Sequence, residues 1–254
     1  ETKQPRTSKM KNKEYFQLEE SEITGIIIGI AVIVITLLIF VIWHRRRNAR
    51  RGVLLTGLSD SGKTLIFSQL LHDRYVNTHT SVKENIGDYQ RGKISLRVVD
   101  IPGHERLRGK FFDNFKTTAR GVIYVIDSVS FQKDVRDVAE FLYILLTDPV
   151  VASNCPPFLI LCNKQDQTLA KGCSVIQTLL EKEMNMLRLT KSKQLDSTVE
   201  TANNNSFLGK QDKDFEFSHL YPIKVEFAES CARMKEEDEE PELDCVREWL
   251  QKIA

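Results

Sequence analysis

The sequence Gly57-Leu58-Ser59-Asp60-Ser61-Gly62-Lys63-Thr64 follows a short apolar run at residues 53–56. It has the pattern GxxxxGK(S/T) between an expected strand and an expected helix. A glycine-rich loop in this context turns backbone N–H groups toward phosphate oxygens, and the helix N-terminus adds positive potential. Lys63 would neutralise the terminal phosphates, and the Thr64 hydroxyl would bind Mg²⁺. The sequence therefore predicts a phosphate-binding loop with the candidate contacts Gly57, Ser59, Asp60, Ser61, Gly62, Lys63 and Thr64.

A DxxG pattern, Asp100-Ile101-Pro102-Gly103, ends a later apolar run. We expect Asp100 to hold Mg²⁺ through water and the Gly103 N–H to meet a γ-phosphate. His104 comes next and is the candidate catalytic residue, positioned to orient an attacking water; the alternative is a surface histidine without a role. No arginine in the sequence can be identified as a built-in finger, so we expect slow intrinsic hydrolysis.

An NKxD pattern, Asn163-Lys164-Gln165-Asp166, follows another apolar run. The Asp166 carboxylate can accept hydrogen bonds from guanine N1–H and the 2-amino group, while Lys164 covers the ring. Adenine lacks those donors, so the site is expected to reject ATP. Together with Asn163, these residues make up the predicted base site.

A switch hydroxyl is expected in Thr78-His79-Thr80-Ser81, where it would bind Mg²⁺ and the γ-phosphate in the GTP state. We assign it to Thr80, which lies seventeen residues after Lys63. Thr78 and Ser81 stay open as alternatives. The predicted metal ligands are therefore Thr64, Thr80 and Asp100.

Strand-like and helix-like runs alternate along the chain. The strand-like runs are residues 53–56, 94–100, 121–127, 158–162 and 223–227. The helix-like runs are residues 63–71, 107–118, 135–146, 173–187 and 241–253. Such alternation predicts an α/β fold with a parallel sheet covered on both faces. The three motifs each follow a strand, which is where open α/β sheets bind ligands.

Residues 23–43 contain no charged side chain and match the roughly 20 residues needed to cross a bilayer core. A secretory signal would have a shorter apolar region and a cleavage site. The basic linker at residues 44–52 places the following domain in the cytosol, because basic residues are retained on that side. Residues 1–22 are then expected to form a lumenal tail.

The remaining features restrict the possible functions. Lys and Arg number 36 against 35 Asp and Glu, so no direct nucleic-acid partner is expected. Five cysteines without CxxC spacing are expected to be reduced thiols. Residues 191–213 read as a polar surface insertion. The acidic run at residues 236–240 reads as a solvated loop, with a partner-binding patch as the alternative.

The motifs resemble the Arf and Sar branch of small GTPases, through Val125-Ile126-Asp127-Ser128 and the histidine after the DxxG glycine. With the apolar segment at residues 23–43, GLSDSGKT, DIPGHE and CNKQD, the chain from Ile23 onward is similar to the family of signal recognition particle receptor β subunits. Cys231-Ala232-Arg233 stands where small GTPases carry a Ser-Ala-Lys loop, so the resemblance implies that Cys231 and Ala232 contact the guanine O6 through the backbone.

The resemblance implies a P-loop small GTPase fold with a mostly parallel six-stranded sheet at residues 53–254, preceded by one transmembrane helix, with GTP or GDP and Mg²⁺ as cofactors. It implies a single-pass protein of the endoplasmic reticulum membrane that anchors the receptor α subunit for co-translational targeting. The α-subunit N-terminal domain would bind residues 78–81 and 104–115 in the GTP state. Contact with the signal recognition particle and the ribosome would be indirect.

Two other functions fit part of the sequence pattern. An Arf/Sar-like regulatory GTPase in vesicle traffic fits the first resemblance, but the nine-residue linker reaches at most about 30 Å and keeps the domain at the membrane. A translation-factor-like GTPase shares the DxPGH pattern, but the balanced charge and the apolar segment count against it.

Overall fold

The computed structural model describes residues 25, 27–40, 50–92, 94–196, 208–210, 212–233 and 241–254, with backbone alone for 192–196. The chain divides into two units, Glu1–Ala49 and Arg50–Ala254, which are described separately. The predicted tail at residues 1–22, both ends of the predicted span and linker residues 44–49 lie outside the described residues. So do the acidic run at residues 236–240 and most of the predicted insertion.

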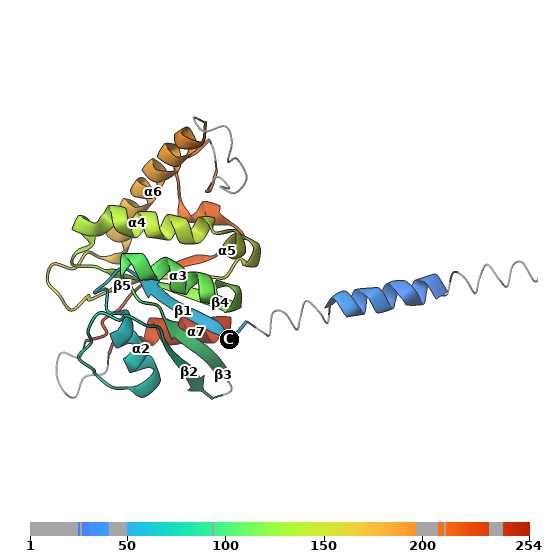
Figure 1. The fold of residues 1–254 in the computed structure, drawn as a ribbon, viewed down its shortest axis with the longest axis horizontal. Coiled ribbons are helices and arrows are strands. Elements are labelled where there is room, and N and C mark those ends of the chain that lie inside the picture. The colour runs from blue at the N-terminus through green and yellow to red at the C-terminus, as the bar shows by residue number, and fades with distance from the viewer. Residues whose placement is uncertain are drawn as a thin grey trace, which may run out of the picture. The chain divides into compact units, whose positions relative to one another are not determined.

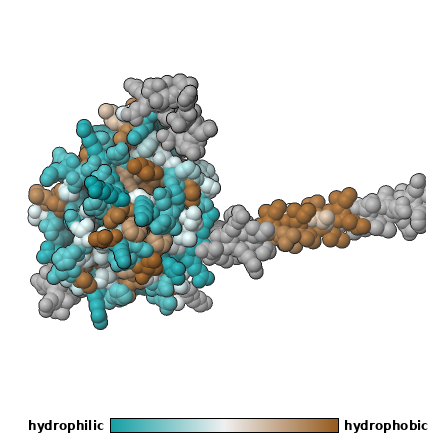
Figure 2. Space-filling view, in the orientation of Figure 1, coloured by the Kyte–Doolittle hydropathy of each residue, from teal (hydrophilic) through white to brown (hydrophobic). Residues whose placement is uncertain are grey.

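In the first unit, residues 25 and 27–40 are helical, and their side chains are exposed. Figure 2 shows these residues as hydrophobic on the face that is drawn. Within the described parts of the chain, no helix is both long and apolar enough to count as a candidate membrane span.

The second unit is built on a six-stranded sheet with the strand order β2-β3-β1-β4-β5-β6 (Figure 1). The strands are β1 Gly52–Gly57, β2 Asn85–Arg91, β3 Ile94–Asp100, β4 Ala119–Asp127, β5 Phe158–Asn163 and β6 Val225–Glu229. Among the pairings of these six strands, β2–β3 alone is antiparallel. The mostly parallel six-stranded sheet is thus confirmed.

Helices connect the strands and follow the predicted runs closely. They are α2 Lys63–His72, α3 Glu105–Phe115, α4 Phe131–Thr147, α5 Pro149–Asn154, α6 Cys173–Asp196 and α7 Asp244–Ile253, with 3-10 turns η1 Lys116–Thr118 and η2 Phe217–Leu220. Several boundaries differ from the prediction: α3 is Glu105–Phe115 rather than residues 107–118, and α4 begins at Phe131 rather than at residue 135. The last helix begins at Asp244 rather than at residue 241, because Glu242 pairs with Cys231 in an isolated bridge. Helix α6 continues to Asp196, so the start of the predicted insertion is helical.

The sheet is covered on both faces, as predicted. One core cluster combines alternate strand residues with helices α3, α4, α5 and α6, and the other combines the intervening strand residues with α2 and α7. In β4, for example, Tyr124 and Ile126 belong to the first cluster, whereas Ile123 and Val125 belong to the second. Because β1, β3, β4 and β5 are parallel, their carboxyl ends meet at one edge of the sheet, where all three motifs lie.

Candidate nucleotide-binding site

The loop between β1 and α2 passes so close to its neighbours that it requires glycine. Gly57 has φ +143°, and a Cβ there would lie 2.3 Å from the carbonyl oxygen of Val125. Gly62 has φ +91°, and its Cβ would lie 2.4 Å from Nδ2 of Asn163. A Cβ on Gly103 would lie 2.6 Å from the backbone nitrogen of Ser59, so the DxxG segment packs directly on the phosphate loop.

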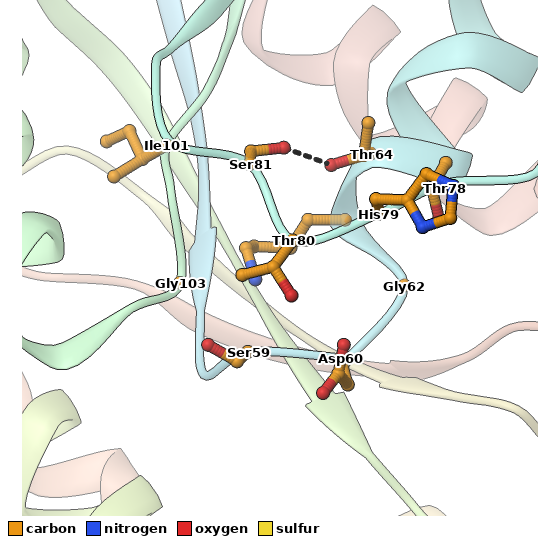
Figure 3. Close-up of a pocket in the computed structure, with 11 residues that line it drawn as sticks. Ser59, Asp60, Gly62, Thr64, Thr78, His79, Thr80, Ser81, Ile101 and Gly103 are labelled. Carbon is orange, nitrogen blue, oxygen red and sulfur yellow. Dashed lines mark hydrogen bonds between the residues drawn. The ribbon is translucent and has the colours of Figure 1, made fainter.

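A cavity of about 50 Å³ opens beside this loop (Figure 3). Its lining residues come from the loop, the predicted switch segment and the DxxG segment: Ser59, Asp60, Gly62, Lys63, Thr64, Thr78, His79, Thr80, Ser81, Ile101 and Gly103. We call this cavity the phosphate pocket. It brings together all the predicted phosphate contacts except Gly57 and Ser61, which lie in the loop behind it.

Lys63 is buried at the phosphate pocket. Its Nζ donates to the Leu58 carbonyl oxygen at 2.5 Å and to Ser61 Oγ at 3.3 Å. Burial lowers the pKa of Lys63 to about 8, although the Asp100 and Asp60 carboxylates oppose the shift. A buried ammonium whose bonded partners are neutral oxygens is suited to an anionic ligand.

Asp100, the predicted metal ligand, directly precedes Ile101, which lines the phosphate pocket. It is 0% exposed, and its Oδ2 accepts from Thr64 Oγ1 at 2.8 Å and from Asn85 Nδ2 at 3.0 Å. Its Oδ1 is buried and makes no hydrogen bond in the structure. Burial raises the pKa of the Asp100 carboxyl. An unpaired carboxylate oxygen beside a threonine hydroxyl fits Mg²⁺, which prefers oxygen ligands and keeps several waters.

The three candidate switch hydroxyls all line the phosphate pocket. Ser81 Oγ lies 3.2 Å from Thr64 Oγ1. Figure 3 marks this hydrogen bond with a dashed line. In this conformation the geometry therefore favours Ser81, one of the alternatives, as the hydroxyl next to Thr64. The assignment to Thr80 stays a prediction.

His104, the candidate for orienting the attacking water, does not face the phosphate pocket in this structure. It is exposed and is the N-cap of α3, where its Nδ1 accepts from the Arg106 N–H at 3.3 Å. It does not belong to the lining of the phosphate pocket. A water-orienting role would require the His104 side chain to leave this cap, and the role stays a prediction.

A second cavity, of about 330 Å³, adjoins the first at Gly62. We call it the base pocket; it is lined by Gly62, Leu65, Asp127, Val129, Asn163, Lys164, Asp166, Gln167, Ala232 and Arg233. Asn163 is 2% exposed and joins three loops. Its Nδ2 donates to the Ser61 carbonyl oxygen at 2.9 Å, and its Oδ1 accepts from Ser230 Oγ and the Ala232 N–H, both at 3.3 Å.

Two charged groups of the base pocket already have partners. Lys164 has φ +67°, and its Nζ donates to Asp127 Oδ2 at 2.6 Å. Asp166 Oδ2 accepts from Gln167 Nε2 at 2.6 Å, and its Oδ1 accepts from the Cys231 thiol at 3.4 Å. Cys231 thus contacts Asp166 through its side chain and is not part of the pocket lining, whereas Ala232 is.

The sequence motifs did not single out Asp127 and Asn85, two polar residues that bond predicted site residues. Asp127 pairs with Lys164, and its place at the carboxyl end of a predicted strand was a usable signal. Asn85 donates to Asp100, but it lies on β2, which the sequence pattern did not reveal.

Comparison with known proteins agrees with this arrangement. Residues 48–224 match the family described as signal recognition particle receptor beta subunit. The human signal recognition particle receptor subunit beta is 41% identical over 247 residues, covering 95% of this chain and 90% of that protein. The structure of the mammalian SRP receptor is 44% identical, covers 80% of this chain and 100% of that chain, and has a TM-score of 0.70.

More distant similarities mark the limits of the resemblance. A Chaetomium thermophilum structure, titled as an SRb-GTP/SRX complex, shares the fold at 18% identity with a TM-score of 0.62, covering 79% of this chain and 99% of that one. Mouse ADP-ribosylation factor-like protein 15 is 30% identical over 127 residues, which is 50% of this chain and 61% of that protein. The Arf-like resemblance is therefore partial, and the chain belongs to the signal recognition particle receptor beta subunit family.

Proposed function

We propose that this chain is a GTPase subunit that uses GTP, GDP and Mg²⁺ to control docking of the receptor α subunit at the endoplasmic reticulum membrane. The observation that carries the proposal is the meeting of the phosphate pocket and the base pocket at Gly62. A nucleotide lying across Gly62 has Lys63 at its phosphates and Asp166 at its base.

Guanine selectivity rests on Asp166, which accepts from the N1–H and 2-amino donors. The Cys231 thiol and the Gln167 amide already fix the orientation of this carboxylate, so little ordering is needed when the base arrives. Lys164 covers one face of the ring. Ala232 lies beside the base pocket, but its N–H bonds Asn163, so a contact to O6 shares this donor or uses a neighbouring N–H.

Phosphate and Mg²⁺ binding rests on Lys63, Thr64, Asp100 and the Gly103 N–H, with Thr80 or Ser81 as the switch hydroxyl. No arginine lines the phosphate pocket among the residues that the structure describes. Slow intrinsic hydrolysis is consistent with this, since a positive charge at the transferring phosphoryl group accelerates such reactions.

The docking surface for the α-subunit N-terminal domain is proposed beside the phosphate pocket. Four apolar side chains flank the switch segment and are between 46% and 71% exposed: Tyr75, Val76, Val82 and Ile86. We call them the switch patch. The γ-phosphate and Mg²⁺ can order residues 78–81 and Gly103 together, which GDP cannot do. The Chaetomium thermophilum relative, by its title, is complexed with SRX in the GTP form.

We further propose that residues 23–43 cross the membrane once, with residues 53–254 in the cytosol. The support is the run of uncharged residues and the arginines that follow it. Alkaline carbonate extraction of membranes should leave the protein in the pellet with either nucleotide. Release into the supernatant would contradict the span.

The docking proposal is tested by co-purification from detergent-solubilised membranes. Thr64→Asn removes the hydroxyl that bonds Asp100 and should abolish recovery of the α subunit while the protein stays in the membrane fraction. Thr190→Asn, at an exposed position of α6, is the matched control and should recover the α subunit normally. Equal recovery with both variants would contradict nucleotide-controlled docking.

A further inference from the structure

Two cysteines from separate elements meet on one face of the sheet. Cys162, near the carboxyl end of β5, is fully buried, and Cys173, the first residue of α6, is half-buried. In β5 the residues Phe158, Ile160 and Cys162 all face the core cluster that contains the α6 side chains, and Cys173 packs against the same cluster.

Glu229 of β6 is a neighbour of both cysteines. Its Cα is the register partner of Cys162 in the β5–β6 pairing. Its Oε1 accepts from the backbone N–H of Cys173 at 2.7 Å. The start of α6 is therefore held over the end of β5, which brings the two thiols together.

The chain between the two cysteines, residues 163–172, is the loop that carries the NKxD motif. The loop is tied back on itself, because Gln165 Nε2 donates to the Lys171 carbonyl oxygen at 3.0 Å and the Lys171 N–H donates to the Ser128 carbonyl oxygen at 3.0 Å. Neither Cys162 nor Cys173 lines the base pocket. A bond between their sulfur atoms would close this loop into a ring without occupying the nucleotide site.

We infer that Cys162 and Cys173 form a reversible disulfide that locks the base-binding loop. With hydrogen peroxide as the oxidant, the Cys173 thiolate attacks one peroxide oxygen, which gives a sulfenic acid and hydroxide. The Cys162 thiol then attacks that sulfur, the S–S bond forms, and the sulfenic oxygen leaves as water once it takes the thiol proton. Two electrons pass from the thiols to peroxide, and a dithiol reductant reverses the change.

The electrostatics of the pair agree with this order of events. The hydrogen bond between the two thiols lowers the pKa of Cys173 and raises the pKa of Cys162, which burial raises further. The more exposed sulfur is thus the better nucleophile, and the buried one keeps its proton until it resolves the sulfenic acid. Glu229 opposes thiolate formation at both positions.

The test uses the full chain in detergent, loaded with GDP, treated with hydrogen peroxide and then alkylated. Peptide mass spectrometry should find Cys162 linked to Cys173, and reductant should separate the two peptides. Release of GDP should slow by about fivefold, the lower end of ordinary coupling between two sites, and reductant should restore it. The release measurement rests on the proposed function, whereas the peptide link does not.

Variants make the outcome decisive. Cys173→Ala should abolish both the link and the slowing. The double variant Cys155→Ala with Cys245→Ala should retain both, since Cys155 directly follows α5 and Cys245 lies on α7. Absence of the link in the folded double variant, or pairing of Cys173 with another cysteine, would overturn the inference. A link that forms without any GDP binding would instead count against the proposed function alone.

Discussion

At the residue scale, the site is dominated by two buried charges. Lys63 and Asp100 are both buried. Burial lowers the pKa of Lys63 and raises the pKa of Asp100, so it favours the neutral form of each side chain. The three motifs were sufficient to predict that these residues belong to one site. The hydrogen bond from Asn85 to Asp100 was not predictable, because it depends on the pairing of β2 with β3.

The lowered pKa of Lys63 predicts proton uptake on nucleotide binding. The unfolded chain keeps this proton up to about the ordinary pKa of 10.5, whereas the folded protein loses it near 8. The unfolded state therefore binds more protons between these values, and stability without nucleotide should rise with pH across that window. Phosphate favours the protonated amine, so Mg²⁺-GDP binding at pH 8 should take up about half a proton.

Calorimetry in buffers of different ionisation enthalpy measures this uptake. The uptake should fall toward zero at pH 6.5, where Lys63 is already protonated, and Lys63→Arg should remove it at pH 8. No uptake at pH 8 in the unaltered protein would show that phosphate does not bind beside Lys63.

Asp166 predicts the nucleotide preference. Asp166→Asn should weaken GTP binding about 100-fold, since two hydrogen bonds to a charged acceptor are lost at about 1.5 kcal/mol each. The same change should improve xanthine nucleotide binding, because an amide can donate to the 2-oxo group. Competition against a fluorescent GDP analogue measures both effects, with Asp212→Asn, an exposed position, as control. Equal affinity of the unaltered protein for ATP and GTP would contradict guanine recognition by Asp166.

At the element scale, hydrophobic pattern predicted the buried elements and missed the exposed ones. Five of the six strands were located because they form apolar runs, although β6 begins two residues later than expected. Strand β2, with the sequence NIGDYQR, lies at the edge and buries only Tyr89, so it has no apolar run. Helix α5 has six residues, too few to show a helical period, and depends on Asp148, which accepts from the Val150 and Val151 N–H groups.

The packing of Trp249 of helix α7 on the sheet is expected to stabilise the folded protein. Trp249 is 1% exposed, and a Cβ on Gly121 of β4 would lie 2.7 Å from its Cη2, so the ring packs directly on the sheet. Trp249→Ala should lower the free energy of unfolding by about 3 to 5 kcal/mol. Urea unfolding followed by circular dichroism measures the change. Glu248→Ala, an exposed neighbour, should stay within about 0.5 kcal/mol, and a similarly small loss for Trp249→Ala would mean that α7 is not anchored by this contact.

At the scale of the whole molecule, the parallel sheet explains why motifs far apart in the chain form one site. The carboxyl ends of β1, β3, β4 and β5 share an edge, and the phosphate pocket and the base pocket lie side by side along it. The switch patch flanks residues 78–81 in the chain, and residues 78–81 line the phosphate pocket. Nucleotide state and α-subunit docking are therefore expected to be coupled through that segment, while the proposed span keeps the domain at the membrane in either state.

The affinity of the α-subunit N-terminal domain for the two nucleotide states tests this coupling most directly. Calorimetry would compare the protein loaded with Mg²⁺ and a non-hydrolysable GTP analogue with the protein loaded with Mg²⁺-GDP. The account predicts binding at least about tenfold tighter in the GTP-like state, within the usual range of coupling between two sites. Equal affinity in the two states would contradict it and leave a constitutive tether.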